Sequence, residues 1–147
     1  MKYTDGKNIM VYAQSADGAP VGAALETVSK AAELAKANGE EVIAVVFGKD
    51  TDTKTVITAG ASKVLVAGEE GLQAEEKAQI LVKLAEKYQP KAVYMAGTPE
   101  GKMIAPAVSA VFESGCVTDV TGITADGVYT SLSYNGNVLN DMKMGEN

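Results

Sequence analysis

The residues best suited to chemistry in this sequence lie in a glycine-bounded loop at residues 97–101, which reads Gly-Thr-Pro-Glu-Gly. An apolar run at 92–96 precedes it and apolar residues at helical spacing follow it, so the loop is predicted to join a strand to a helix. Unpaired N–H groups at the start of such a helix favour an anion, and glycines let a phosphate or ribose approach the backbone. The candidate cofactor-binding residues of this loop are Gly97, Thr98, Gly101 and Lys102.

A second interpretation of the same loop is also open. Thr98 could cap the helix and Pro99 could occupy its first position, which would make the loop a tight connection and nothing more. The G-x-x-x-G spacing matches neither the dinucleotide-binding fingerprint nor the P-loop. Lys102 would be the only cation near a bound anion, and a lysine on a first helical turn is usually solvated surface.

Residues 14–18 (Gln-Ser-Ala-Asp-Gly) follow the first predicted strand, where adenylate-handling α/β domains place a nucleotide loop. They lack consecutive glycines, which favours a plain surface turn. Further along, Asp119 stands near the start of a later strand, where its carboxylate could cap a turn or contact a bound cofactor.

The amino-acid composition argues against several kinds of chemistry and several classes of partner. All thirteen basic residues are lysines, there is no histidine, and the formal net charge is −6. The absence of arginine removes the bidentate grip on phosphate, the absence of histidine removes the usual proton shuttle, and an acidic surface argues against nucleic acid or anionic membranes as partners. Neither catalytic residues nor a metal site are predicted. The first residues do not resemble a signal peptide, so a cytoplasmic location is expected.

The elements that must position the loop alternate regularly along the chain. Apolar runs predict strands at 9–13, 42–47, 63–67 and 92–96, with a further strand beginning near Val117. Helices are predicted from Pro20 to about residue 38, from 53 to Gly60, at 75–88 and after residue 98. Runs that are apolar on both faces are typical of parallel strands covered by helices.

This alternation predicts one domain over residues 1–147, a three-layer α/β/α sandwich of the adenine-nucleotide-binding or Rossmann-like type with about five parallel strands. Asp126-Gly127 predicts an antiparallel hairpin at the edge of the sheet. Residues 138–147 are expected to fray or to dock elsewhere. On the helix at 75–88, Ala78 and Leu81 are expected to face inward and Lys77 to face water.

Four short motifs in order resemble the N-terminal domain of the electron transfer flavoprotein α subunit. They are Ala-Gly-Ala-Ser-Lys-Val at 59–64, Gly-Lys-Met-Ile-Ala-Pro at 101–106, Gly-Cys-Val-Thr-Asp-Val at 115–120 and Tyr-Asn-Gly-Asn at 134–137. The resemblance implies a domain that pairs with a β-type subunit, while FAD is held mainly by a separate C-terminal domain outside these 147 residues. Asp119 and Asn137, which lie in matched motifs, complete the set of candidate cofactor-binding residues.

The sequence departs from the family pattern where arginines are usual. Lys102 and Met103 replace an arginine-aspartate pair, Ala107 replaces a later arginine, and Ser131-Leu132 stands in place of arginine-proline. Loss of these arginines removes contacts that would orient a partner domain or a cofactor.

The resemblance favours a docking platform in electron transfer, a carrier component more than an enzyme, with a β-type subunit as partner. The alternative is a sensor or regulatory module that binds AMP or another adenine nucleotide through the loops at 14–18 and 97–101. A homo-oligomer formed through the hairpin and tail is a third hypothesis.

Overall fold

The computed structural model describes residues 7–69, 71–112, 115–120, 122–123, 129–130 and 136–140, with side chains through residue 111. Its central sheet has six strands in the order β5-β4-β1-β6-β10-β7. In chain order, these strands are β1 (Ile9–Tyr12), β4 (Val42–Phe47), β5 (Lys63–Ala67), β6 (Ala92–Ala96), β7 (Gly115–Val120) and β10 (Gly136–Asn140). The helices are α1 (Gly22–Ala37), α2 (Thr53–Ala59), α3 (Ala74–Tyr88) and α4 (Pro99–Phe112).

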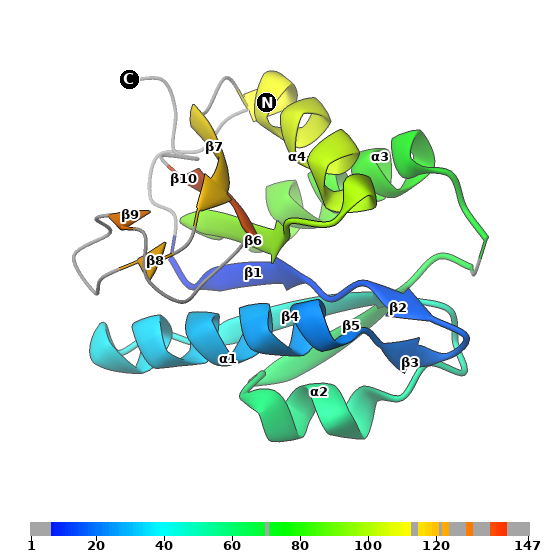
Figure 1. The fold of residues 1–147 in the computed structure, drawn as a ribbon, viewed down its shortest axis with the longest axis horizontal. Helices are drawn as coiled ribbons and strands as arrows, with labels where there is room; N and C mark the ends of the chain where they lie inside the picture. The colour runs from blue at the N-terminus through cyan, green and yellow to red at the C-terminus, as the bar shows by residue number, and fades with distance from the viewer. Residues whose placement is uncertain are drawn as a thin grey trace.

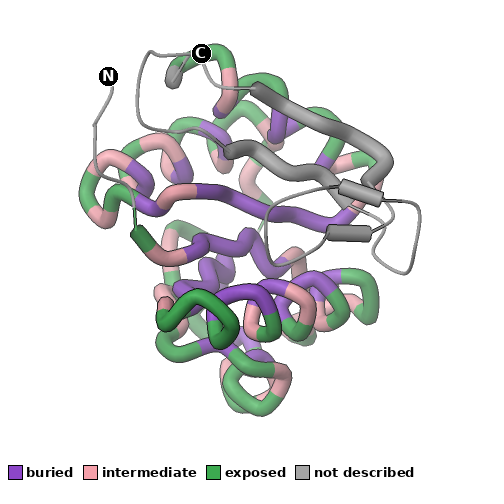
Figure 2. Tube along the Cα trace, turned by 90° about the vertical axis from the view of Figure 1, so that its left-hand side faces the viewer, coloured by how far each residue is buried: buried purple, intermediate pink, exposed green. Residues whose placement is uncertain are grey.

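Two pairs of helices cover the two faces of the sheet. Helices α1 and α2 lie on one face, and α3 and α4 lie on the other (Figure 1). Successive residues of β1 point to opposite faces, so Ile9 and Val11 pack with α1 whereas Met10 and Tyr12 pack on the α3 and α4 side. The central strands are buried along their length (Figure 2). The predicted three-layer α/β/α class is confirmed.

In the parallel part of the sheet, the direction in which successive strands are added reverses at β1. Strand β4 pairs with β1 on one side and β6 pairs with it on the other, both in parallel. The chain therefore builds outward to β5 first and then returns to the opposite side of β1. In open α/β sheets, ligands bind at such a switch point, beyond the carboxyl ends of the strands.

Several predicted elements agree closely with the structure. Strands β4, β5 and β6 have the predicted bounds, and α3 begins one residue earlier than expected. Helix α2 begins after Asp52, whose side chain accepts a hydrogen bond from the N–H of Thr55. Hydrogen bonds from Thr55 hold the pKa of Asp52 below its ordinary value. The helix ends at Gly60, where φ is 131°.

The loop expected at residues 14–18 is in part a small hairpin, and the prediction that α1 starts at Pro20 is wrong. Ser15–Ala16 (β2) pairs with Ala19–Pro20 (β3), and α1 begins at Gly22. Asp17 and Gly18 form the two-residue turn, with φ angles of 53° and 79°. Asp-Gly is a strong signal for this turn, since both positions need positive φ.

The C-terminal part of the sheet also differs from expectation. Strand β10 lies between β6 and β7 and is antiparallel to both, so residues 138–140 belong to the main sheet and not to a tail. Strand β7 therefore runs parallel to β6, and it is the fifth of the roughly five parallel strands that were predicted. The hairpin arms pair as β8 (Gly122–Ile123) and β9 (Tyr129–Thr130) in a separate two-stranded sheet. Residues 124–128 and 141–147 lie outside the described residues.

Helix α4 turns one face to the sheet and another to solvent. Ile104 and Val108 are fully buried, whereas Val111, which follows them at helical spacing, is 42% exposed. From Met103 to Phe112 every residue of this helix except Ser109 is apolar, so the spacing of apolar residues alone could not define the buried face.

Val108→Asp should destabilise the protein by more than about 3 kcal/mol, because it places a carboxylate against the apolar face of the sheet. Ala110→Asp is the matched control: Ala110 is exposed on the same helix, and its free energy of unfolding should change by about 0.5 kcal/mol. Urea denaturation of both variants measures the difference. Equal stability of the two variants would show that α4 packs through another face.

Candidate functional site

The ends of β1 and β6 are joined by a pair of polar side chains. The hydroxyl of Thr98 donates to the side-chain oxygen of Gln14 over 2.5 Å and accepts a hydrogen bond from the N–H of Gly101 over 3.1 Å. The backbone oxygen of Thr98 accepts from the N–H of Lys102 over 2.9 Å. The two loops singled out in the sequence therefore meet at the switch point, where Thr98 caps α4.

This arrangement does not fit the pyrophosphate of FAD at the loop. The N–H of Gly101, which could bind an anion, already donates to Thr98, and Pro99 at the start of the helix has no N–H. Gly101 is buried, and the carboxylate of Glu100 adds negative charge beside it. The geometry therefore supports the tight-connection interpretation. Cofactor binding by Gly97, Thr98, Gly101 and Lys102 stays a prediction.

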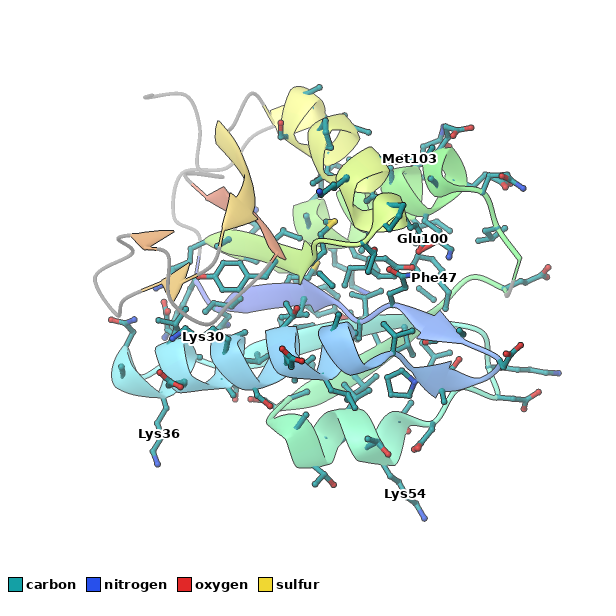
Figure 3. The ribbon with its side chains drawn as sticks, viewed as in Figure 1. Lys30, Lys36, Phe47, Lys54, Glu100 and Met103 are labelled. Carbon is teal, nitrogen blue, oxygen red and sulfur yellow. The ribbon has the colours of Figure 1, made fainter. Side chains whose placement is uncertain are left out.

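Next to this cap lies a network of three side chains from three elements. The Tyr12 hydroxyl at the end of β1 donates to Glu100 Oε1 on the first turn of α4. Lys77 Nζ on α3 lies 2.9 Å from Glu100 Oε2 and donates to the Tyr12 hydroxyl over 3.2 Å. Figure 3 shows Glu100 and Phe47 in neighbouring positions between α4 and the sheet. The network ties the start of α4 to both β1 and α3.

Two aromatic rings surround the ammonium group of this network. Lys77 Nζ lies 5.5 Å from the centroid of Phe47 and 5.8 Å from that of Tyr12, within the range of cation–π attraction. The two rings meet edge to face at 5.6 Å. Burial, followed by the hydrogen bond and the charge of Glu100, raises the pKa of Tyr12 far above its ordinary value. Tyr12 is therefore a neutral phenol across the physiological range, and the ammonium and the carboxylate offset each other.

The prediction that Lys77 faces water is wrong. Its side chain is only 12% exposed and is paired with Glu100. The helical pattern of α3 places Lys77 beside the apolar stripe, and its partner belongs to an element that follows more than twenty residues later. The available signals were a tyrosine that ends an apolar strand and a glutamate inside the loop at 97–101.

A pocket of about 170 Å³ adjoins the network at the ends of β1 and β4. Its lining residues are Tyr12, Ser15, Asp17, Gly18, Phe47, Gly71 and Lys77. The Oγ atom of Ser15 is buried and has no hydrogen-bond partner. Ser15, Asp17 and Gly18 belong to the loop at 14–18 that the sequence had suggested as a possible ligand loop, whereas the walls from two other parts of the chain, around residues 47 and 71–77, were not predicted.

The remaining predicted site residues come to the same edge of the sheet. Gly136 of β10 lies opposite Ala96 of β6 and opposite Val120 of β7. Asn137 and Asp119 neighbour these positions, so their backbones lie near the carboxyl end of β6. Their side chains are outside the described part of the structure, and a cofactor contact from either residue stays a prediction.

Two absences apply to the described residues alone. Within them, no group of three or more His, Cys, Asp and Glu side chains is arranged to hold a metal ion. No helix in the described ranges has the length and apolar character needed to cross a membrane.

The fold and this edge of the sheet define a Rossmann-like α/β protein whose best-placed polar groups are paired with one another. Comparison with protein families matches residues 9–144 to the electron transfer flavoprotein domain. The chain belongs to the electron transfer flavoprotein domain family, which confirms the resemblance seen in the four motifs.

Two curated relatives are α subunits. The electron transfer flavoprotein subunit alpha of Clostridium acetobutylicum is 29% identical over 131 residues, covering 86% of this chain and 39% of the relative. That of Thermoanaerobacterium thermosaccharolyticum is 28% identical over 148 residues, covering 95% of this chain and 45% of the relative. The chain thus spans less than half the length of either. A solved structure, a universal stress protein in complex with cAMP, is 15% identical with a TM-score of 0.44, covering 72% of this chain and 92% of that chain.

Glu100→Gln should lower the free energy of unfolding by about 1–2 kcal/mol, because it leaves the largely buried ammonium of Lys77 without a counter-charge. Glu33→Gln is the matched control. Glu33 pairs with Lys30 at 3.3 Å but is 72% exposed, so its loss should change stability by less than about 0.5 kcal/mol. Chemical denaturation at neutral pH compares them, and equal effects would contradict a structural role for the network.

Tyr12 should make stability fall with rising pH in the alkaline range. The folded state retains the Tyr12 proton above a pH of about 10, where the unfolded chain releases it, so the free energy of unfolding decreases from there upward. Tyr12→Phe removes this contribution and should flatten the slope. Denaturation of both proteins between about pH 8 and pH 11 tests this, and identical slopes would contradict the raised pKa.

Proposed function

We propose that this chain is a docking component of an electron transfer flavoprotein, which places a β-type subunit and a flavin-bearing region relative to each other. Membership of the family and the similarity to α subunits support this role. The described residues contribute paired polar groups and an interaction surface, with no constellation suited to catalysis among them. In this proposal the pyrophosphate of the flavin lies away from the loop at 97–101, because Thr98 already pairs with the N–H of Gly101.

The observation that supports docking most directly is the outer face of α4. Met103 is 60% exposed and Val111 is 42% exposed. The two residues lie about two turns apart on the outer side of the helix. Three further exposed residues make up the same surface: Pro106, Ala107 and Ala110. We call these five residues the α4 face. A contiguous apolar surface of this kind is typical of a site that another protein covers.

The α4 face also coincides with the departures from the family pattern. Met103 and Ala107 stand where the family usually has charged residues, so the partner surface of this protein is expected to be more apolar than usual at that point. The capped start of α4, fixed by Thr98 and by the network at Glu100, holds this helix in one orientation. A rigid surface loses little conformational entropy when a partner binds.

Met103→Lys should weaken association with a β-type subunit of the family by about tenfold or more, because it places a charge in the centre of an apolar contact. Ile57→Lys is the matched control: Ile57 is 47% exposed on α2, on the opposite side of the sheet. Light scattering and titration calorimetry measure the complex. If both variants bind as the wild type does, the α4 face is not the docking surface. A complex of doubled mass without the β-type subunit would favour the homo-oligomer instead.

A further inference from the structure

Strand β5 forms one edge of the central sheet. It pairs with β4 in parallel on one side, and among the described residues no strand pairs with its other side. Backbone N–H and carbonyl groups of successive residues in a strand point alternately to its two sides, so every second residue of β5 points these groups away from β4. An edge of this kind can accept one more strand, because the added chain supplies the missing hydrogen-bond partners.

Two lysine ammonium groups lie against one tyrosine ring beside this edge. Lys63 Nζ on β5 is 5.8 Å from the ring centroid of Tyr88, and Lys87 Nζ on α3 is 5.4 Å from it. Both lysines are exposed, and within the part of the chain that the structure describes neither forms an ion pair with a carboxylate. The start of β5 therefore presents two unpaired positive charges, although the chain as a whole has a formal net charge of −6.

The other exposed side chain of the strand is apolar. Val66 is 48% exposed. Side chains alternate along a strand, so Val66 shares the face of Val64, which packs with α1 and α2, whereas Lys63 lies over Tyr88 on the α3 face. A strand that matches both residues must carry an apolar and a charged side chain three positions apart, one on each face.

Neither a free anion nor a second copy of this chain matches the whole edge. A free anion would meet the lysines but leave the backbone groups and Val66 uncovered. Strand β5 reads Lys-Val-Leu-Val-Ala, so self-pairing within the strand places no carboxylate opposite Lys63. An acidic residue on a different chain would provide that carboxylate.

We propose that β5 binds an extended acidic segment of a partner protein as an added antiparallel strand, with an acidic residue opposite Lys63 and an apolar residue opposite Val66. The antiparallel sense is the more stable of the two per residue. Backbone hydrogen bonds supply affinity in this mode, and the two side-chain positions supply specificity. The surface is separate from the α4 face, because α4 packs on β6, β7 and β10 and β5 lies at the other end of the strand order.

An acetylated and amidated pentapeptide, Thr-Val-Thr-Val-Glu, tests the proposal with the whole chain. When it pairs antiparallel to β5, its glutamate lies opposite Lys63 and its first valine lies opposite Val66. An NMR titration of isotope-labelled protein should shift the amide signals of residues 63–67, with a dissociation constant on the order of 1 mM. A control peptide that ends in lysine should bind about tenfold more weakly.

Lys63→Glu should reverse this preference, because the charge that selects the acidic residue changes sign. Lys36→Glu is the matched control: Lys36 is an exposed lysine in the last turn of α1, so the same change in net charge should leave the preference unchanged. Met103→Lys should also leave it unchanged, which separates this edge from the docking role of the α4 face. Melting temperatures check that all variants fold.

Absence of peptide binding, amide shifts confined to residues outside β5, equal binding of the two peptides by the wild type, or an unreversed preference in Lys63→Glu would overturn the proposal. A doubled mass in light scattering without peptide, together with protection of the β5 amides from hydrogen exchange, would assign the edge to a second copy and would overturn it as well.

Discussion

Strand β1 is buried on both faces and paired on both edges, and the rest of the molecule is arranged to satisfy that constraint. A parallel strand in this position must have helices above and below, because neither face can meet water. Parallel neighbours also require crossover connections, and α1 and α3 provide connections of this kind on opposite sides of the sheet. The switch of direction at β1 follows from this arrangement, and so does the crevice beyond its carboxyl end.

At that crevice several polar side chains form hydrogen bonds with one another. Gln14 is bonded to Thr98, and Tyr12 and Lys77 are bonded to Glu100, so these three side chains find their partners at the start of α4. In a site of low dielectric, such pairing avoids the large cost of an uncompensated charge. The result is a well-fixed α4 with an apolar outer face, which suits a docking role better than it suits catalysis.

Local sequence rules predicted the regular elements well. The bounds of β4, β5 and β6, the Asp52 cap of α2 and the Thr98 cap of α4 all follow from side chains within a few residues of the feature they define. The hairpin at residues 15–20 was missed although Asp17-Gly18 is the same turn signal that was recognised at Asp126-Gly127. The site was predicted only in part. The loops at 14–18 and 97–101 were identified as candidates, but the network of Tyr12, Lys77 and Glu100 and the pocket walls at Phe47 and Gly71 were not.

The sequence by itself determined the three-layer class, the order of strands and helices, and the family, because apolar periodicity, capping residues and ordered motifs are local properties of the chain. Only the tertiary structure decided that β10 enters the sheet between β6 and β7, that Lys77 turns from solvent to Glu100, and that Val111 faces outward. Each of these depends on contacts between residues far apart in the chain. A lysine at the border of a helical stripe, and a helix whose second half is apolar at nearly every position, have no preferred direction until a neighbouring element supplies a partner or a covering surface.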